Sequence, residues 1–402
     1  MTRRLATVRR VSAVWPIAAD KVEAVTVGGW TCVAPVGRFR EGDLALFFEI
    51  DSFLPAADPR WAYLENRFTT FDGARGFRVR STKIRGQMSQ GILAALDEFP
   101  EVAIRRAALE ARHAGASEAE IDDLLLREES FDEVLGVRKY DPVMVSEVKK
   151  REDKNAAGGL TPLPDFIPRT EQERVQNLPP DAFERWKDEV FQESVKMDGS
   201  SMTVYFVRND SPLFGCLPAL PGGDGGGSGA VPETGRNRRG DAVQPNGRVG
   251  VASRNMEQRE NQGGHYWAAA RRHGLPAKLS ALGRNLAVQG ELCGSSIQKN
   301  FEGFPAGAHD FFAFAVWDID ASRYLPPREA EDLAVRALSI LHVPVIGYAP
   351  LRYIGLSVDE LLARAEGVGI HGRKREGIVL KHVAGEFSFK AISNSYLLKH
   401  GE

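Results

Sequence analysis

Residues 193–202 read Glu-Ser-Val-Lys-Met-Asp-Gly-Ser-Ser-Met and lead into the run Thr-Val-Tyr-Phe-Val that ends at Val207. Lys196 stands among apolar positions that alternate as they do in β-strands, although burying a lysine is costly. One interpretation is a solvent-facing lysine in a turn. The other is a nucleophile whose pKa is lowered by its surroundings, so that the uncharged amine can attack an electrophile.

The order of the motifs downstream of Lys196 favours the nucleophile. Five short motifs follow along the chain: Ser253-Arg-Asn, Gln289-Gly-Glu-Leu, Phe311-Phe-Ala-Phe, Glu376-Gly-Ile-Val-Leu-Lys and Phe389-Lys-Ala-Ile. One such motif is weak evidence, but the series of six resembles the covalent nucleotidyltransferases, the superfamily of ATP-dependent ligases and capping enzymes. The resemblance implies that the lysine attacks the α-phosphorus of ATP, forms lysyl-AMP and releases pyrophosphate.

Length and composition set limits on the class of protein. With 402 residues, 43% of them hydrophobic, the chain has room for two or three domains with ordinary cores. No apolar run reaches the ~18 residues of a membrane span, and the first residues lack the apolar core of a signal peptide, so we expect a cytoplasmic protein. The distant cysteines Cys32, Cys216 and Cys293 argue against a disulfide framework and against structural zinc.

The pattern of elements predicts an α+β protein that begins with a small β-barrel. The resemblance implies that this barrel is OB-like and that it precedes an ATP-grasp-like or nucleotidyltransferase domain with antiparallel sheets and flanking helices. Residues 1–97 hold five or six short strands with glycine turns, which is typical of a small barrel. Residues 98–160 are a helical segment, with an N-cap at Ser117, and a linker. Residues 161–402 form the predicted covalent nucleotidyltransferase (adenylyltransferase) domain. Its Gly-rich stretch at 215–247 is expected to be a flexible loop between two strands.

A basic stretch closes the predicted barrel. It contains Arg78, Arg80, Lys83 and Arg85. Because the net charge of the chain is only -2, any nucleic-acid site must be a local basic patch of this kind. The patch is either a solvated strand face or a contact for the phosphates of RNA or of a duplex.

Three carboxylates stand beside glycine or at strand ends in separate motifs: Asp198, Glu291 and Glu376. Any one of them could be a solvent-facing acid in a turn. Together they offer the oxygen ligands that suit Mg²⁺ or Mn²⁺, an ion that keeps several waters and bridges phosphates. A hydrated ion near Lys196 would also lower the pKa of the lysine by repulsion between the two cations.

Cations are needed because pyrophosphate is a highly anionic leaving group. The candidates are Arg254, Lys381 and Lys390, with Arg174 as a more speculative fourth. Each alone is an ordinary surface residue, but together with Lys196 they would make a phosphate clamp.

Two phenylalanines of one motif are expected on the same face of their strand, Phe312 and Phe314, with Phe311 and Ala313 on the other face. An aromatic ring in such a site can stack on adenine. We expect Phe312 to pack in the core. We assign the stacking on adenine to Phe314, which occupies the aromatic position of the family's motif.

The order of the domains narrows the resemblance to one group of ligases. Only residues 394–402 follow the last motif, and the barrel, with its segment Arg85-Gly-Gln-Met-Ser-Gln-Gly-Ile-Leu, lies in front. This arrangement resembles the RNA ligases of the Deinococcus type. The resemblance implies ATP-dependent sealing of 3′-OH and 5′-phosphate ends, at nicks with an RNA 3′-OH strand, with RNA as the partner and a monomeric enzyme. A DNA ligase, and a nucleic-acid-binding OB protein with an inactive nucleotidyltransferase body, are the alternatives.

The resemblance also implies a role for each matching residue. It makes Lys196 the adenylylated nucleophile, and it has Asp198, Glu291 and Glu376 hold a hydrated metal ion. Arg254 and Glu291 would contact the nucleotide, and Phe314 would stack on adenine. Lys390 would contact the α-phosphate. One position departs from the pattern, because related ligases often carry a second lysine where this chain has Ile392. Lys399 or arginines of the Gly-rich loop are candidates to replace it.

Overall fold

The chain, seen here as a computed structural model, is described for residues 3–141, 161–179, 181–218, 240–260, 264–385 and 387–400. It divides into two compact units. The first consists of Met1–Val145, Gln176–Pro180 and Asn394–Glu402, and the second of Ser146–Val175 and Asp181–Ser393. Among the described residues, no helix is both long and apolar enough to cross a membrane.

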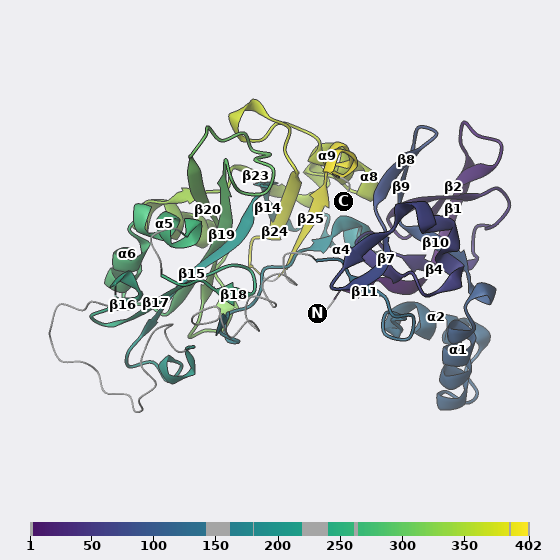
Figure 1. Cartoon of the computed structure of the whole chain (residues 1–402), viewed down its shortest axis with the longest axis horizontal. Helices are drawn as coiled ribbons and strands as arrows, with labels where there is room; N and C mark the ends of the chain where they lie inside the picture. The colour runs from purple at the N-terminus through teal and green to yellow at the C-terminus, as the bar shows by residue number, and fades with distance from the viewer. Residues whose placement is uncertain are drawn as a thin grey trace. The chain divides into compact units, whose positions relative to one another are not determined.

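The first unit is a small barrel of short antiparallel strands with helices added to it (Figure 1). One sheet has the strand order β10-β4-β1-β2-β3, a second the order β11-β5-β7-β6, and β8 and β9 form a hairpin. The elements are β1 (Ala6–Pro16), β2 (Val22–Val27), β3 (Trp30–Pro35), β4 (Leu44–Phe48), β5 (Ser52–Pro55), η1 (Pro59–Arg67), β6 (Thr69–Phe71), β7 (Ala74–Arg78), β8 (Ser81–Ile84), β9 (Gln87–Gln90), β10 (Ile92–Ala95), η2 (Leu96–Glu98), α1 (Pro100–Arg112), α2 (Glu118–Glu128), β11 (Arg138–Lys139) and α9 (Asn394–His400).

The β8–β9 hairpin has a two-residue turn at Arg85 and Gly86. Ile84 pairs with Gln87 across it, and both turn residues have positive φ, 50° and 89°. Positive φ at both central positions is what a type I′ turn requires, and this turn matches the twist of the strands that it joins. The hairpin therefore presents Lys83 and Arg85, both exposed, at its tip.

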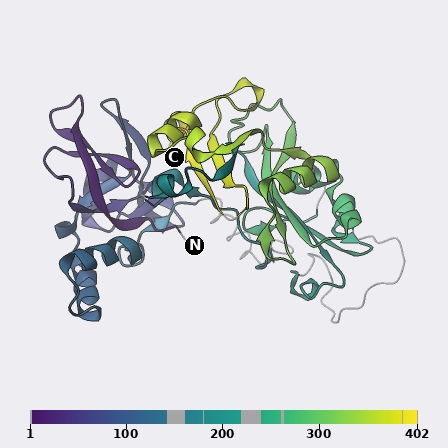
Figure 2. The same cartoon turned by 180° about the vertical axis from the view of Figure 1, so that it is seen from behind.

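Helices α1 and α2 belong to the first unit because their apolar faces complete its core. Leu109 and Leu125 are fully buried in one cluster with Val8 and Phe48 of the barrel strands, and Figure 2 shows the two helices again at one end of those strands. A capping box at Ser117 starts α2, as the sequence predicts. Residues 98–141 thus pack with the barrel, while residues 142–160 of the expected linker lie outside the described residues.

The second unit contains two sheets. The larger has the order β12-β18-β17-β15-β19-β20-β21, with β16 beside β17 and β22 beside β20, and the smaller has the order β13-β25-β24-β14-β23. The strands are β12 (Thr161–Pro162), β13 (Glu173–Arg174), β14 (Val190–Lys196), β15 (Ser200–Arg208), β16 (Val243–Gln244), β17 (Gly247–Ala252), β18 (Met256–Glu257), β19 (Leu286–Gly294), β20 (His309–Asp318), β21 (Arg323–Tyr324), β22 (Leu341–His342), β23 (Val345–Pro350), β24 (Gly377–His382) and β25 (Ser388–Ile392).

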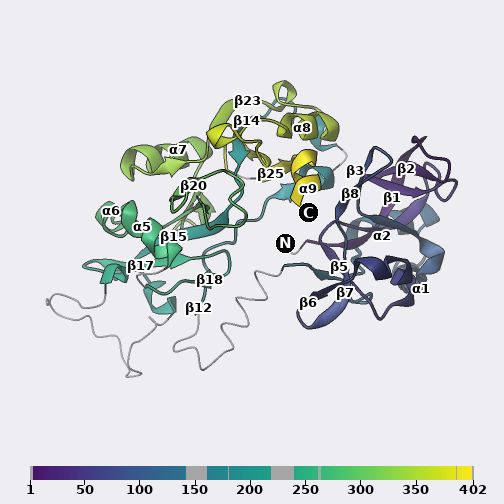
Figure 3. The same ribbon diagram turned by 45° about the horizontal axis from the view of Figure 1, so that its top comes forward.

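Helices cover the larger sheet on one side, where Trp267, Leu279 and Ala334 join the strands in the main core of the unit (Figure 3). The helical elements are η3 (Val175–Asn177), which spans the boundary between the units, α4 (Ala182–Trp186), η4 (Phe214–Cys216), η5 (Gly240–Ala242), α5 (His265–Arg272), α6 (Leu275–Leu282), α7 (Pro327–Asp332), a π-helical turn η6 (Leu333–Ala337), η7 (Leu351–Tyr353), α8 (Val358–Ala365) and η8 (Ile370–Gly372). The predicted α+β class is confirmed.

The Gly-rich stretch lies between β15 and β17, and its described part contains η5 and the short strand β16. Strands β15 and β17 pair antiparallel, with Arg208 opposite Gly247. Residues 219–239 of the stretch, including its arginines, lie outside the described residues.

Helix α1 offers a matched pair of substitutions that tests its role in the core of the first unit. Leu109 is 0% exposed and Ile104 on the same helix is 70% exposed. Leu109→Ala should lower the free energy of unfolding by about 2–5 kcal/mol, because it leaves a cavity. Ile104→Ala should change it by less than about 0.5 kcal/mol. Urea denaturation followed by circular dichroism measures both, and equal effects would show that the helix is not part of the core.

Candidate active site

Lys196 lies where the chain passes from one sheet to the other. It is the last residue of β14 in the smaller sheet, and four residues later Ser200 begins β15 in the larger sheet. Lys196 pairs with Gly377, the neighbour of Glu376, on β24. On the other side of the junction, Ser201 pairs with Glu291 on β19. Strand register therefore brings three of the predicted motifs to one place.

The lysine forms an ion pair with one of the predicted carboxylates. Its Nζ donates a hydrogen bond of 2.7 Å to Oε2 of Glu376. The side chain of Lys196 is 23% exposed and that of Glu376 is 8% exposed. Glu376 is followed by Gly377. Only glycine fits at that position, because a Cβ there would lie 2.2 Å from the carbonyl oxygen of Ala391.

The electrostatics correct one expectation about Lys196. Burial lowers its pKa, but the carboxylates of Glu376, Glu291 and Asp198 raise it by more, so that the pKa of the lysine is higher than normal. The ammonium form is therefore stabilised in the chain without nucleotide or metal. The lowered pKa expected from the sequence is wrong for this state, because the acids around the lysine outweigh its burial.

The acids in turn carry raised pKa values. Burial raises the pKa of Glu291 to about 8, against the opposing effect of the Lys196 charge, and the charges of Glu376 and Asp198 add to the rise. Burial also raises the pKa of Glu376, again opposed by Lys196. Burial thus favours the protonated forms of these acids, and a further cation beside them would favour the ionised carboxylates.

Glu302 is part of this cluster, although it stands in none of the sequence motifs. It is 1% exposed, and its Oε1 accepts a hydrogen bond of 3.0 Å from the backbone N–H of Asp198. Its Oε2 is buried without a hydrogen-bond partner in the structure. Burial raises the pKa of Glu302 to about 7, and the backbone of Asp198 opposes this shift.

Two more side chains hold the backbone of the lysine loop. The Sγ of Cys293 lies 3.7 Å from the carbonyl oxygen of Asp198, and Nε2 of Gln298 donates to the carbonyl oxygen of Gly199 at 3.4 Å. A Cβ at Gly199 would lie 2.9 Å from Cγ of Glu291, so the loop approaches β19 as closely as only glycine allows. The loop is fixed by its surroundings on both sides.

Two of the predicted cations are neighbours in the smaller sheet. The short strand β13 runs parallel to β25, and Arg174 is directly paired with Lys390. Arg174 is 6% exposed, and the charge of Lys390 lowers the pKa of Glu376, although burial dominates that pKa and raises it. Lys390 is therefore close enough to Glu376 to act on the same group, and Arg174 stands beside it.

Ile392 is buried, 3% exposed, and pairs with Gly377. It lies two residues after Lys390 and hence on the same face of β25. The second lysine of related ligases is thus replaced by an apolar side chain beside the Glu376 motif. Of the suggested replacements, Lys399 lies on α9, in the first unit, and the loop arginines lie outside the described residues.

The predicted adenine-stacking ring meets a third cation. A β-bulge in β20 displaces Phe314, since Gln289 pairs with Ala315 and Gly290 with Ala313. Nζ of Lys381 donates to the carbonyl oxygen of Phe314 and lies 5.2 Å from the centre of its ring. Burial lowers the pKa of Lys381 to about 7. Phe312 packs with Val195 in a small core, as expected, and Phe314 is partly buried against the same core.

The remaining predicted residues have other contacts. Arg254 follows β17 and forms an ion pair with Glu171. Arg78 donates a hydrogen bond of 2.7 Å to Asp51 and stacks on Tyr140 at 4.7 Å. Arg80, Lys83 and Arg85 are exposed on the first unit.

Within the described ranges, no group of three or more His, Cys, Asp or Glu side chains is placed to hold a metal ion. The excess of buried acid around Lys196, together with the unpartnered Oε2 of Glu302, nevertheless suits an ion that keeps its waters and is held at a distance by carboxylates.

This fold and this lysine–carboxylate site define a nucleotidyltransferase domain preceded by an OB barrel. A family model described as an OB-fold domain matches residues 5–96, and one described as RNA ligase matches residues 189–392. A mutant of Naegleria gruberi RNA ligase with ATP and Mn is 35% identical over 100% of both chains, with a TM-score of 0.76. No curated protein matches the chain.

Further structures of the Naegleria enzyme agree. A mutant with AMP and Mn is 35% identical, with 99% of each chain covered and a TM-score of 0.75. The enzyme with PPi is 35% identical, with the same coverage and a TM-score of 0.74. The chain therefore belongs to the RNA ligase family, and the predicted fold and enzyme class, an ATP-dependent RNA ligase, are confirmed.

Glu302 can be tested as a positioning residue for the lysine loop. Glu302→Ala removes the acceptor for the Asp198 N–H and should slow transfer of AMP to the protein by roughly 10- to 100-fold, the range expected for a hydrogen bond to a charged group. Glu302→Gln keeps a carbonyl oxygen and should retain most of the rate. Single-turnover labelling with α-labelled ATP at several ATP concentrations separates the maximal rate, which should fall, from the apparent affinity.

Equal defects in the two Glu302 variants would show that the charge of the carboxylate matters and not its hydrogen bond. Unfolding midpoints of both variants serve as the control for folding.

Proposed function

We propose that this RNA ligase seals 3′-OH and 5′-phosphate ends at nicks with an RNA 3′-OH strand, as its resemblance to the Deinococcus-type ligases implies. The reaction passes through lysyl-AMP and an AMP-capped 5′ end. The contact of Lys196 with Glu376, at 2.7 Å, carries the proposal, because it places an amine among acids at a strand junction. The Naegleria structures support it, since they hold ATP with Mn, AMP with Mn, and PPi.

In the first step Nζ of Lys196 attacks the α-phosphorus of ATP. A nitrogen–phosphorus bond forms, the bond from the α-phosphorus to the bridging oxygen breaks, and pyrophosphate leaves with that oxygen. The attacking nitrogen must first lose a proton, and Oε2 of Glu376 already accepts a hydrogen bond from it. Glu376 thus orients the nitrogen, and the proton leaves to solvent once a bound cation lowers the pKa of the lysine.

Cations of the smaller sheet stabilise the phosphates. Lys390 and Arg174, paired on neighbouring strands, contact the α-phosphate and the leaving group. Burial lowers the pKa of Lys381 to about 7, and a nearby phosphate would restore its charge. Arg254 would have to exchange Glu171 for the nucleotide. Phe314 stacks on the adenine.

Asp198, Glu291 and Glu376 would hold a hydrated Mg²⁺ or Mn²⁺ ion, and Mn in the Naegleria structures supports this assignment. When bound, the ion supplies positive charge at the phosphates. The same charge would offset the three carboxylates that now raise the pKa of Lys196. Burial would then dominate the pKa of the lysine and favour the neutral amine.

In the later steps the barrel serves the RNA, with Arg78, Arg80, Lys83 and Arg85 as phosphate contacts. Arg78 would remain bound to Asp51 and so contribute less than the three exposed cations. We further propose a monomeric enzyme that acts in the cytoplasm.

The nucleophile is tested by substitution of Lys196. Incubation with α-labelled ATP and Mg²⁺ or Mn²⁺ should label the wild-type protein, and Lys196→Ala should remove the label. Lys196→Arg is the matched control, because arginine keeps the positive charge beside Glu376 yet does not lose its proton. It should fold like the wild type and also remain unlabelled. A covalent adenylate on either variant would move the nucleophile elsewhere.

The substrate is tested with four matched nicks that carry RNA or DNA on each side. We expect fast sealing when the 3′-OH strand is RNA and slow sealing when it is DNA, measured as ligated product on denaturing gels. Equal sealing of the all-DNA nick would favour the DNA ligase alternative. Labelling by ATP without sealing of any nick would restrict the enzyme to another arrangement of ends.

A further inference from the structure

A cavity of about 980 Å³ opens in the first unit, and every residue that lines it lies between Val33 and Phe99. Its walls come from η1, from strand β7, from the β8–β9 hairpin and from the start of β10. None of the residues assigned to the adenylylation site takes part. The cavity is large enough for a ligand of several rings.

The charge of the lining is one-sided. Five arginines line the cavity but only one acid, Glu98. Three of the arginines are engaged within the unit: Arg38 with Glu98, Arg60 with Asp58 and Glu101, and Arg78 with Asp51.

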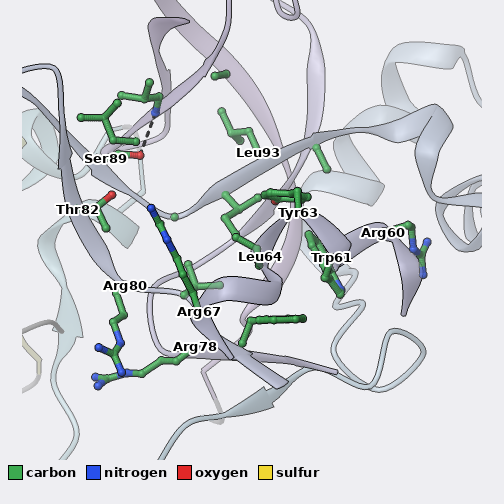
Figure 4. A pocket seen from close by; sticks show the side chains of 18 of the residues that line it. Arg60, Trp61, Tyr63, Leu64, Arg67, Arg78, Arg80, Thr82, Ser89 and Leu93 are labelled. Carbon is green, nitrogen blue, oxygen red and sulfur yellow. Dashed lines mark hydrogen bonds between the residues drawn. The ribbon is translucent and has the colours of Figure 1, made fainter. Parts of the chain in front are cut away.

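Two arginines at the cavity, Arg67 and Arg80, remain uncompensated. Both are exposed, and neither forms an ion pair or hydrogen bond with any part of the chain that the structure describes. In Figure 4 the side chain of Arg67 extends from η1 toward Thr82, and those of Arg78 and Arg80 project together at one edge. Uncompensated guanidinium groups at a cavity favour an anionic ligand, and phosphate above all.

The same cavity exposes aromatic rings. Tyr63 is 67% exposed and Phe68 is 52% exposed, although both are large and both line the cavity. Trp61, 3% exposed, forms part of the floor. Exposed rings beside arginines are what proteins use to bind single-stranded nucleic acid, because bases stack on the rings while the backbone follows the cations.

We infer that this cavity binds an unpaired segment of the RNA substrate, with a base stacked on Tyr63 and phosphates on Arg67 and Arg80, since the guanidinium of Arg75 already lies over the ring of Phe68 at 4.1 Å. An unpaired strand is favoured over a duplex because the rings can stack only on bases that expose a face. This inference rests on the proposed function, and it differs from a phosphate contact on a duplex by requiring rings as well as charge. The ligase would thereby hold a single-stranded extension of the RNA that it joins.

The test uses the full chain and two fluorescent probes: a single-stranded RNA of ten nucleotides and a blunt RNA duplex of ten base pairs. Tyr63→Ala should weaken binding of the single strand about 10-fold, the effect of losing one stack, and change duplex binding less than about 2-fold. Tyr63→Phe should bind like the wild type. Because the Tyr63 side chain is mostly exposed, these variants should fold normally.

A charge variant tests the phosphates. Arg67→Glu with Arg80→Glu should lower the slope of log affinity against log salt for the single strand by roughly 1.4, about 0.7 for each lost contact. Arg112→Glu with Arg127→Glu changes the net charge equally, at exposed positions of α1 and α2 outside the cavity, and should leave the slope nearly unchanged.

Single-strand binding by Tyr63→Ala at the wild-type level would overturn the inference, as would an equal loss of single-strand and duplex binding. Labelling with α-labelled ATP and sealing of plain nicks by the wild type are measured in parallel, because their failure would concern the proposed function. Normal labelling and sealing by the wild type, with single-strand binding unaffected by the cavity variants, would remove the cavity from the enzyme and leave the proposed function intact.

Discussion

The catalytic unit depends on a change of sheet within three residues. Between Lys196 and Ser200 the chain leaves the smaller sheet and enters the larger one. This crossing requires Gly199, where a Cβ would lie 2.5 Å from the carbonyl oxygen of Leu292. Once the crossing is fixed, antiparallel register leaves little freedom, and Glu376 and Glu291 arrive at the lysine from strands that belong to different sheets.

Crowding of acids around one lysine follows from this geometry and carries a free-energy cost. Glu291 and Glu302 have pKa values raised to about 8 and about 7, chiefly by burial. Each raised pKa means that the ionised form is less stable in the folded chain than in water. A ligand that brings positive charge would favour the ionised carboxylates and so offset this cost.

The sequence was sufficient to predict which motifs meet, but not how they interact. Lys196, Glu291 and Glu376 stand in short motifs whose order along the chain carries the information. Glu302 could not be found in this way, because its contact with Asp198 depends on the path of the loop between β19 and β20. The only signal in the sequence was that Glu302, a charged residue, stands between Phe301 and Gly303.

Two further features also needed the three-dimensional structure. The direction of the pKa shift of Lys196 is a sum of opposing effects of burial and of three carboxylates, and a sequence pattern gives neither distances nor exposure. Residues 394–402 belong to the unit of the barrel and not to the domain that precedes them in sequence. The reason is that α9 packs near β8. Patterns of polarity show that a helix has an apolar face, but they do not name the partner of that face.

The chain crosses between the units close in sequence to the paired cations Arg174 and Lys390. Arg174 lies two residues before Gln176, and Lys390 lies four residues before Asn394, and both of these later residues belong to the first unit. The first crossing is anchored in the barrel, since Trp30 Nε1 donates to Asn177 Oδ1 at 2.8 Å. The two strands that carry the paired cations thus run directly into segments held by the barrel. The backbone that positions this pair of cations therefore continues, within four residues on each strand, into segments of the first unit.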